Sequence, residues 1–95
     1  MDPDLPDLTI ADVVVSTAGR DVGQLFYVLE TDGTYLMLID GKGRTIEKPK
    51  RKKIKHTKKV LRSETRVAEK LRLGDKVLNS ELRRDLAYLR NNLGG

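Results

Sequence analysis

Short apolar runs separated by glycine-containing turns fill the chain up to about residue 56. Runs rich in β-branched and aromatic side chains predict strands, because such side chains suit a pleated, half-buried surface. Asp32-Gly33, between two of these runs, is a dipeptide typical of a tight hairpin. We therefore predict five short strands, at residues 13–15, 24–30, 34–40, 44–47 and 53–56.

No helical pattern interrupts these runs, so the strands are expected to pair antiparallel. The sheet is too small for a two-sheet sandwich but must still bury one face. The predicted fold is therefore mainly β, a small SH3-like five-stranded antiparallel barrel. Its candidate core residues are Val14, Leu25, Val28, Leu36, Leu38, Ile46 and Ile54.

Beyond residue 56 the apolar residues recur with a helical period. A first short helix is predicted over residues 64–71, with Ser63 as its N-cap and Gly74 at its end. Val60 is assigned to the apolar side of this helix. The helical tail is therefore expected to begin near residue 60.

A second helix is predicted from Asn79 or Ser80 to about Asn91. A helix this short is not stable alone, so its apolar stripe needs a surface to pack on. The barrel, a second copy of the chain and another protein all remain open as that surface. The stripe consists of Leu82, Leu86 and Leu89, and the arginines beside it are Arg83, Arg84 and Arg90.

These elements divide the chain into three parts. We assign residues 1–9 to an extended acidic lead-in and residues 10–59 to the barrel, which carries a basic segment at 48–59. Residues 60–95 form the C-terminal tail of two short α-helices.

Charge is distributed unevenly over the 95 residues. Residues 1–47 hold 3 basic and 9 acidic side chains, a net of −6, whereas residues 48–95 hold 16 basic and 5 acidic ones, a net of +11. The basic segment alone carries eight Lys/Arg and no acid, so it repels itself unless an anion neutralises it. We expect RNA phosphates to be contacted by Lys48, Lys50, Arg51, Lys52, Lys53, Lys55, His56, Lys58 and Lys59.

A loop framed by Gly19 and Gly23 is a second candidate contact. Its backbone has little side-chain cover, so it can approach a sugar-phosphate chain closely, and Arg20 lies within it. Asp21 would repel phosphate and is expected to bond backbone amides of the loop instead.

The turn at residues 41–44 offers Lys42 and Arg44 as further contacts. It is no P-loop, because the Lys-Ser/Thr pair and the following helix are missing. The few aromatic side chains do not make a base-stacking platform, which favours recognition of folded RNA by shape and backbone. The aromatic residues expected to pack instead are Phe26, Tyr27, Tyr35 and Tyr88.

Part of the chain resembles the KOW motif, a strand–loop–strand unit of ribosomal proteins and transcription elongation factors. The matching residues are Asp12, Val14, Gly19, Gly23 and Val28. Ala11 stands where the motif has its leading glycine, and Thr57 follows His56 where leucine is expected. Over roughly residues 10–60 the chain is similar to bacterial KOW-domain RNA-binding proteins, and to large-subunit ribosomal proteins of archaea and eukaryotes. That wider similarity includes Gly19-Arg20-Asp21, Asp40-Gly41 and Glu47-Lys48-Pro49-Lys50-Arg51-Lys52-Lys53-Ile54-Lys55-His56.

Several function classes are excluded by composition. Cysteine is absent and His56 is the only histidine, so thiolate chemistry and a transition-metal site are not expected. No Ser/His/Asp arrangement suggests a triad, and we expect neither enzymatic activity, a cofactor nor a small-molecule substrate. No apolar run approaches a membrane span, and the acidic N-terminus does not resemble a signal peptide. We therefore expect a cytoplasmic protein.

The resemblance implies an SH3-like barrel that binds structured RNA, ribosomal RNA above all, with ribosomal proteins as further partners. The charge distribution points the same way. A ribosomal neighbour is then one of the surfaces open to the leucine stripe, and the arginines beside that stripe, Arg83, Arg84 and Arg90, are expected to face RNA. Two alternatives stay open. The first is a protein-binding module of the transcription or translation machinery, gripping its partner through the barrel or the leucine stripe of the last helix. The second, weaker alternative is a double-stranded DNA binder.

Overall fold

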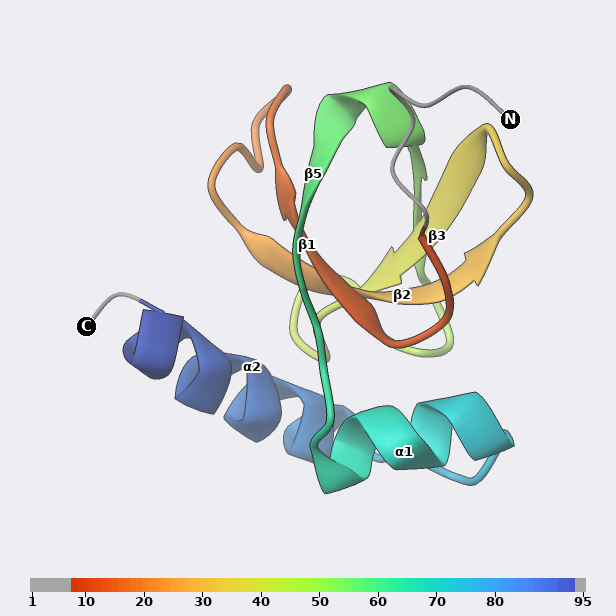
Figure 1. Ribbon diagram of the computed structural model, residues 1–95, viewed down its shortest axis with the longest axis vertical. Coiled ribbons are helices and arrows are strands. Elements are labelled where there is room, and N and C mark those ends of the chain that lie inside the picture. Colours follow the sequence, from red (N-terminus) through yellow and green to blue (C-terminus); the bar gives the residue numbers. More distant parts are fainter. Residues whose placement is uncertain (1–7, 94–95) are drawn as a thin grey trace.

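The computed structural model describes residues 8–93, and most of the predicted lead-in at 1–9 lies outside this range. Five antiparallel strands form one sheet in the order β4-β3-β2-β1-β5, and two helices follow them (Figure 1). A short 3-10 helix, η1, joins the two edge strands. The elements are β1 (Asp12–Ser16), β2 (Leu25–Thr31), β3 (Tyr35–Ile39), β4 (Lys50–Lys53), η1 (Ile54–His56), β5 (Thr57–Arg62), α1 (Arg66–Leu73) and α2 (Asn79–Leu93).

The sheet must curl because its two edges are joined by a very short link. Lys53 ends β4 and Thr57 begins β5, and four Cα steps span at most about 14 Å. The edges of a flat five-stranded sheet would lie about 19 Å apart. Register shifts in the β1–β5 and β2–β3 pairs provide local bends of the kind that increase strand twist.

Two of the predicted strands were wrong. Residues 44–47 form no strand, because the backbone there closes local turns: Asp40 Oδ1 accepts the amides of Lys42 and Arg44, each at 2.9 Å. The expected strand at 53–56 is instead the end of β4 followed by η1. Ile54 is nevertheless buried, and Lys53 and Lys55 are exposed. The alternation of apolar and charged residues in the predicted strand had indicated this burial.

The fifth strand occupies residues expected to lead into a helix. β5 pairs with β1 over its length, with Asp12 opposite Arg62 and Ser16 opposite Thr57. Val60 is therefore a strand residue, packed against the core, and helical structure begins only at α1. The apolar pair Val60-Leu61 suits a strand and a helix equally, so periodicity did not separate the two.

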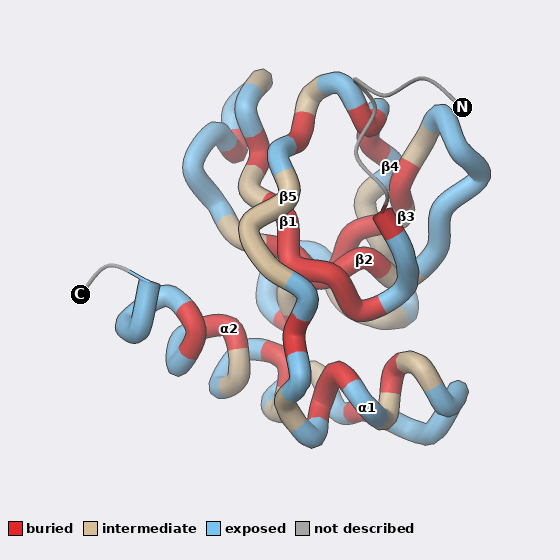
Figure 2. Tube along the Cα trace, in the orientation of Figure 1, coloured by how far each residue is buried: buried red, intermediate tan, exposed pale blue. Residues whose placement is uncertain are grey.

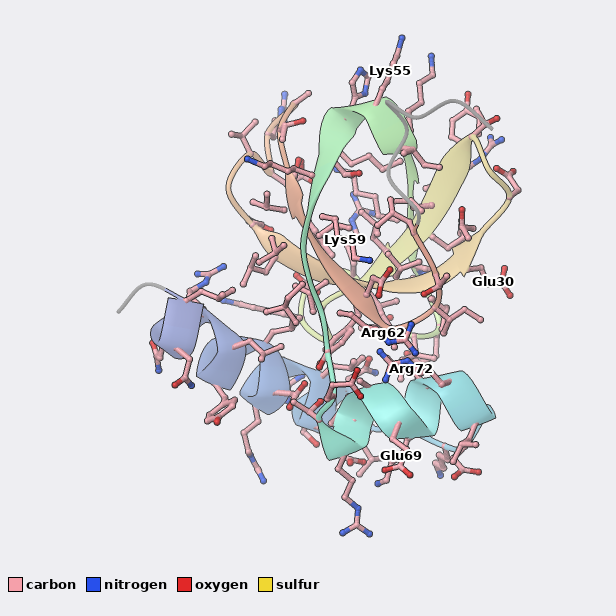
Figure 3. All side chains as sticks on the ribbon, viewed as in Figure 1. Glu30, Lys55, Lys59, Arg62, Glu69 and Arg72 are labelled. Carbon is pink, nitrogen blue, oxygen red and sulfur yellow. The ribbon has the colours of Figure 1, made fainter. Side chains whose placement is uncertain are left out.

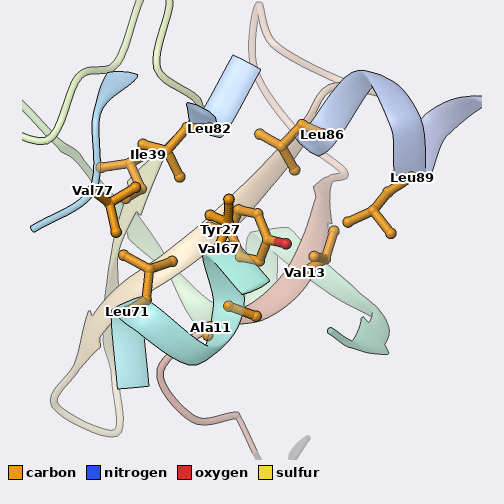
Figure 4. Packing of buried hydrophobic residues seen from close by; sticks show 11 residues of the cluster. Ala11, Val13, Tyr27, Ile39, Val67, Leu71, Val77, Leu82, Leu86 and Leu89 are labelled. Carbon is orange, nitrogen blue, oxygen red and sulfur yellow. The ribbon is translucent and has the colours of Figure 1, made fainter. Parts of the chain in front are cut away.

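Two apolar clusters form, one on each face of the sheet. Buried residues lie in all five strands and in both helices (Figure 2). Strand alternation explains the division: Val13 and Tyr27 face the helices, whereas Val14 and Phe26 face the inside of the curl. The inner cluster contains Leu8, Val14, Phe26, Val28, Leu36, Leu38 and Ile54. The outer cluster joins Ala11, Val13, Tyr27 and Ile39 to Val67, Ala68, Leu71, Val77, Leu82, Leu86 and Leu89 of the helical part (Figure 4).

The helices end near their predicted positions and pack on the sheet. Thr65, not Ser63, caps α1, because its hydroxyl accepts the amide of Ala68 at 3.2 Å. Gly74 ends α1 with φ 74°, as expected. The leucine stripe of α2 is buried, so the tail completes the core of the sheet. Among residues 8–93, no helix is both long and apolar enough to cross a membrane.

Candidate nucleic-acid interface

Side chains of the basic segment point alternately to the two sides of β4, so only some of its lysines face the interior. Lys50 and Lys52 lie on one side of this strand, and their ammonium groups contact the carboxylate of Asp21 at 2.7 and 2.8 Å. Lys52 also donates to the carbonyl of Ala18 at 2.7 Å, and its side chain is 8% exposed. Lys52 is therefore held inside the protein, although its residue type had predicted a phosphate contact.

Asp21 is the internal counter-ion of this pair of lysines. It lies near the middle of the Gly19–Gly23 loop and also accepts the hydroxyl of Ser16 at 2.7 Å. Burial alone would raise the pKa of Asp21, but hydrogen bonds from Lys50, Lys52 and Ser16 outweigh it and hold that pKa well below its usual range. The expectation that its carboxylate bonds loop amides was wrong.

The remaining predicted residues of the basic segment are spread around the sheet. Arg51 lies 3.8 Å above the centroid of the Tyr35 ring, and Lys59 contacts the buried Asp12 at 3.3 Å. His56 is half-buried, and its carbonyl accepts the amide of Thr17. Lys55 projects from η1, away from the helices (Figure 3). The other exposed members are Lys48, Lys53 and Lys58.

Four predicted contacts from distant parts of the chain do come together. Arg20, Lys42, Arg44 and Lys50 line a hollow of about 390 Å³, which we call the basic hollow. Its remaining lining comes from the same loops and from the start of β2. These residues are Asp21, Gln24, Phe26, Asp40 and Gly43. Three segments, the Gly19–Gly23 loop, the 40–44 turn and β4, thus present cations to one concave surface.

Both carboxylates of the basic hollow are engaged inside the protein. Asp21 serves the two lysines, and Asp40 accepts backbone amides of its own turn. By contrast, Arg20, Lys42 and Arg44 are exposed, and their side chains form no hydrogen bond or ion pair within residues 8–93. The hollow therefore offers three free cations to an anion, and a fourth cation of its lining, Lys50, is paired with Asp21.

A second hollow of about 300 Å³ continues this surface onto α2. It shares Gln24, Asp40 and Lys42 with the basic hollow and is bounded by Arg83 and Arg90. Arg83 donates to the carbonyl of Gly41 at 2.6 Å and so ties α2 to the turn. Of the three arginines expected to face RNA, Arg83 and Arg90 lie on this side, whereas Arg84 lines a groove on the opposite flank of α2.

Glycine geometry shapes both loops of the hollow. Gly19 and Gly23 have φ of 88° and 89°, a region that side chains rarely adopt, so the predicted backbone requirement of the loop is present. Gly41, with φ 78°, lies so close to α2 that a Cβ atom there would be 2.2 Å from the carbonyl oxygen of Asn79. Sequence reasoning identified Gly41 as a turn residue but could not find this contact.

The described residues hold no grouping of acidic and histidine side chains that could bind a metal ion. A scan against protein-family models and a search of curated proteins returned no match to this chain.

Proposed function

We propose that this chain is a KOW-type protein that binds structured RNA, ribosomal RNA above all, without catalysing a reaction. The observation that carries the proposal is the basic hollow, where cations from three separate segments converge while both nearby carboxylates are engaged internally. Lysine and arginine neutralise phosphates and release counterions, which gives affinity. The sugar-phosphate backbone of RNA is the ligand that suits this surface.

The lining of the hollow favours recognition of shape over sequence. Phe26, its aromatic residue, is 1% exposed, and Tyr35 lies elsewhere beneath Arg51. Neither offers a free ring for base stacking, the usual means of reading single strands. Arg83 and Arg90 lengthen the cationic surface along α2, which suits a folded RNA that presents phosphates over a broad surface.

The proposal includes an SH3-like barrel of the KOW type. Two observations support it. The link through η1 brings the two edges of the sheet toward a common corner. Ala11, which stands at the position of the motif's leading glycine, has φ 70°, a conformation that glycine adopts without strain.

The test compares two triple variants that lose the same charge. Arg20→Ala/Lys42→Ala/Arg44→Ala removes the free cations of the hollow, whereas Arg66→Ala/Lys76→Ala/Arg84→Ala removes three exposed cations from the helical part. Binding to purified ribosomal RNA is measured over a series of salt concentrations, with circular dichroism as a check of folding. Each lost phosphate contact should flatten the slope of log K against log salt by about 0.7 to 0.9, so the first variant should lose about 2 to 3.

Equal slopes and affinities for the two variants would refute the assignment to the hollow, and absence of salt-dependent binding by the wild type would refute the function itself. Lys50 and Lys52 are left intact in this design, because their removal would unpair Asp21 and confuse folding with binding.

The alternative of a protein-binding module loses one of its two predicted surfaces. Leu82, Leu86 and Leu89 are buried against the sheet, at 0, 7 and 8% exposure, so this stripe has no free area with which to grip a partner.

A further inference from the structure

Helix α2 has two exposed flanks separated by its buried leucines. Arg83 and Arg90 border the hollow described above, whereas Arg84 and Tyr88 border a groove between α2 and α1. This groove has a volume of about 490 Å³ and shares no lining residue with the two hollows. It is therefore a separate surface of the molecule.

The groove combines an apolar floor with an exposed aromatic ring. Val67 of α1 is 8% exposed and lies in the outer cluster, while Tyr88, expected from the sequence to pack, is 60% exposed. A tyrosine whose ring is not covered by its own fold is a frequent anchor of protein interfaces, as is arginine. The groove thus offers a surface on which one apolar side chain of a partner can pack.

The net charge of the groove is positive, because its lining holds Arg66, Lys70 and Arg84 against Glu81 and Asp85. Its two carboxylates are engaged internally: Glu81 accepts Lys70 at 2.9 Å, and Asp85 accepts the hydroxyls of Tyr27 and Thr65. Arg66 and Arg84 are exposed and form no hydrogen bond or ion pair within residues 8–93. An incoming segment therefore meets two guanidinium groups that have no hydrogen-bonded partner, although the charge of Arg66 acts on Glu81 through space.

We propose that the groove between α1 and α2 binds a short acidic segment of a partner protein, which places one leucine or aromatic side chain against Val67 and Tyr88. Carboxylates flanking that side chain pair with Arg66 and Arg84, whose guanidinium groups can form bidentate hydrogen bonds with a carboxylate. A slot between two helices is a common seat for such amphipathic segments. The chain would then hold RNA on one flank of α2 and a protein on the other.

A nucleotide is less well suited to this groove than a peptide. Tyr88 is a single ring, whereas binding of single strands uses successive stacked bases. The floor provided by Val67 is apolar, and an aliphatic or aromatic side chain buries against it without leaving a polar base edge unpaired.

The experiment uses the full chain and a random library of 12-residue peptides displayed on phage. Peptides are selected on the wild type, and a fluorescent peptide with the resulting consensus is then titrated against three variants. Arg84→Glu and Tyr88→Ala change the groove, and Arg90→Glu makes the same charge reversal on the opposite flank of α2. All three side chains are exposed, so each variant is expected to fold.

We expect a consensus with acidic residues around one leucine or aromatic residue. Its affinity should fall at least tenfold with Arg84→Glu and with Tyr88→Ala, and should be unchanged with Arg90→Glu. A consensus without acidic residues, or peptides insensitive to both groove variants, would overturn the proposal.

Ribosomal RNA titrated against the same three variants keeps the two proposals distinguishable. Arg90→Glu should weaken RNA binding and Tyr88→Ala should not. Loss of RNA affinity in Tyr88→Ala would assign the groove to a nucleotide and overturn the peptide proposal, while leaving the RNA function standing.

Discussion

Asp21 balances two ammonium groups with one carboxylate in a nearly closed part of the molecule. Its side chain is 11% exposed, beside Lys52 at 8% and Lys50 at 25%. Removing one partner of a buried ion pair is more harmful than never having the pair, because the remaining charge is left without compensation. The single acid in the glycine-framed loop therefore supports β4 as well as the loop.

We predict that Asp21→Asn lowers the free energy of unfolding by about 3–5 kcal/mol, because both lysines lose their counter-ion. Urea unfolding measures this effect. Glu30→Gln is the matched control, since Glu30 is exposed on β2 (Figure 3) and should stay within about 0.5 kcal/mol of the wild type. An unchanged midpoint for Asp21→Asn would show that the lysines do not depend on this carboxylate.

Acid should weaken the fold through the same residue. The folded state holds the pKa of Asp21 below its ordinary value of 3.8, so the unfolded chain takes up the proton first as pH falls. The stabilisation is complete above about pH 5 and is lost progressively as pH falls toward the folded pKa. Urea midpoints measured from pH 6 to pH 2 should decline less steeply for Asp21→Asn than for the wild type.

Tyr27 makes the complementary prediction at high pH. Burial, together with the hydrogen bond to Asp85, raises the pKa of Tyr27 from 10.0 to about 12. Between these values the unfolded tyrosine is ionised and the folded one is not, so stability falls as pH rises through this interval, by about 2–3 kcal/mol. Tyr27→Phe should be less stable than the wild type at pH 7, and the difference should narrow by pH 12 in urea titrations. A constant difference would contradict this role.

At the scale of elements, the N-terminal part of α2 is attached to the 40–47 segment by polar contacts. Asn79 accepts the amide of Ile46 and donates to Glu47, both at 3.0 Å, while Arg83 donates to the carbonyl of Gly41. The turn that supplies Lys42 and Arg44 to the basic hollow is thus positioned by a helix that begins 35 residues after Arg44.

We predict that Gly41→Ala is destabilising by more than about 2 kcal/mol. Its Cβ would meet the carbonyl oxygen of Asn79 at 2.2 Å, and its φ of 78° adds about 1–2 kcal/mol of backbone strain. Gly43→Ala is the control, because no atom lies within 4 Å of the Cβ position there. Thermal unfolding of both variants measures the contrast, and equal melting temperatures would disprove the close approach.

Truncation after Thr57 should unfold the sheet, although the predicted division of the chain placed the barrel within residues 10–59 and so would leave it almost whole. The cut removes nearly all of β5, which leaves β1 unpaired on one side and uncovers Val13 and Tyr27. Circular dichroism and amide proton dispersion of the shortened chain test this expectation. A native-like spectrum would show that β5 and the helices are dispensable for folding.

Sequence alone predicted the elements that local chemistry determines. The Asp-Gly hairpin, the β2 and β3 strands and the Gly74 end of α1 depend on neighbouring residues, and all were placed to within about a residue. The 44–47 and 57–62 segments were misassigned, because their structure depends in part on partners far along the chain. Asn79, 33 residues after Ile46, accepts the amide of Ile46 in the first segment, and β1 pairs with the second.

At the scale of the whole molecule, the sequence was enough to identify the cationic residues of the candidate interface. It was not enough to predict which of these residues lie together in space. Charge density identified the basic segment, and glycine spacing identified Arg20, Lys42 and Arg44. Which lysines of β4 face inward depends on strand register and on Asp21, which is 29 residues before Lys50. The division of the α2 arginines between two flanks likewise requires the position of the helix on the sheet.

The strand order has a consequence for folding during synthesis of the chain. β1 lies between β2 and β5, so one of its edges stays unpaired until residue 62 has been made, and its helix-facing side stays uncovered until Leu89 follows. At about 5–20 residues per second, some 2–9 s separate the synthesis of β1 from that of its second neighbour. During that interval the nascent chain presents an open apolar strand. Assembly therefore follows an order different from synthesis, because β1, the first strand to be made, is the last strand to gain both of its neighbours.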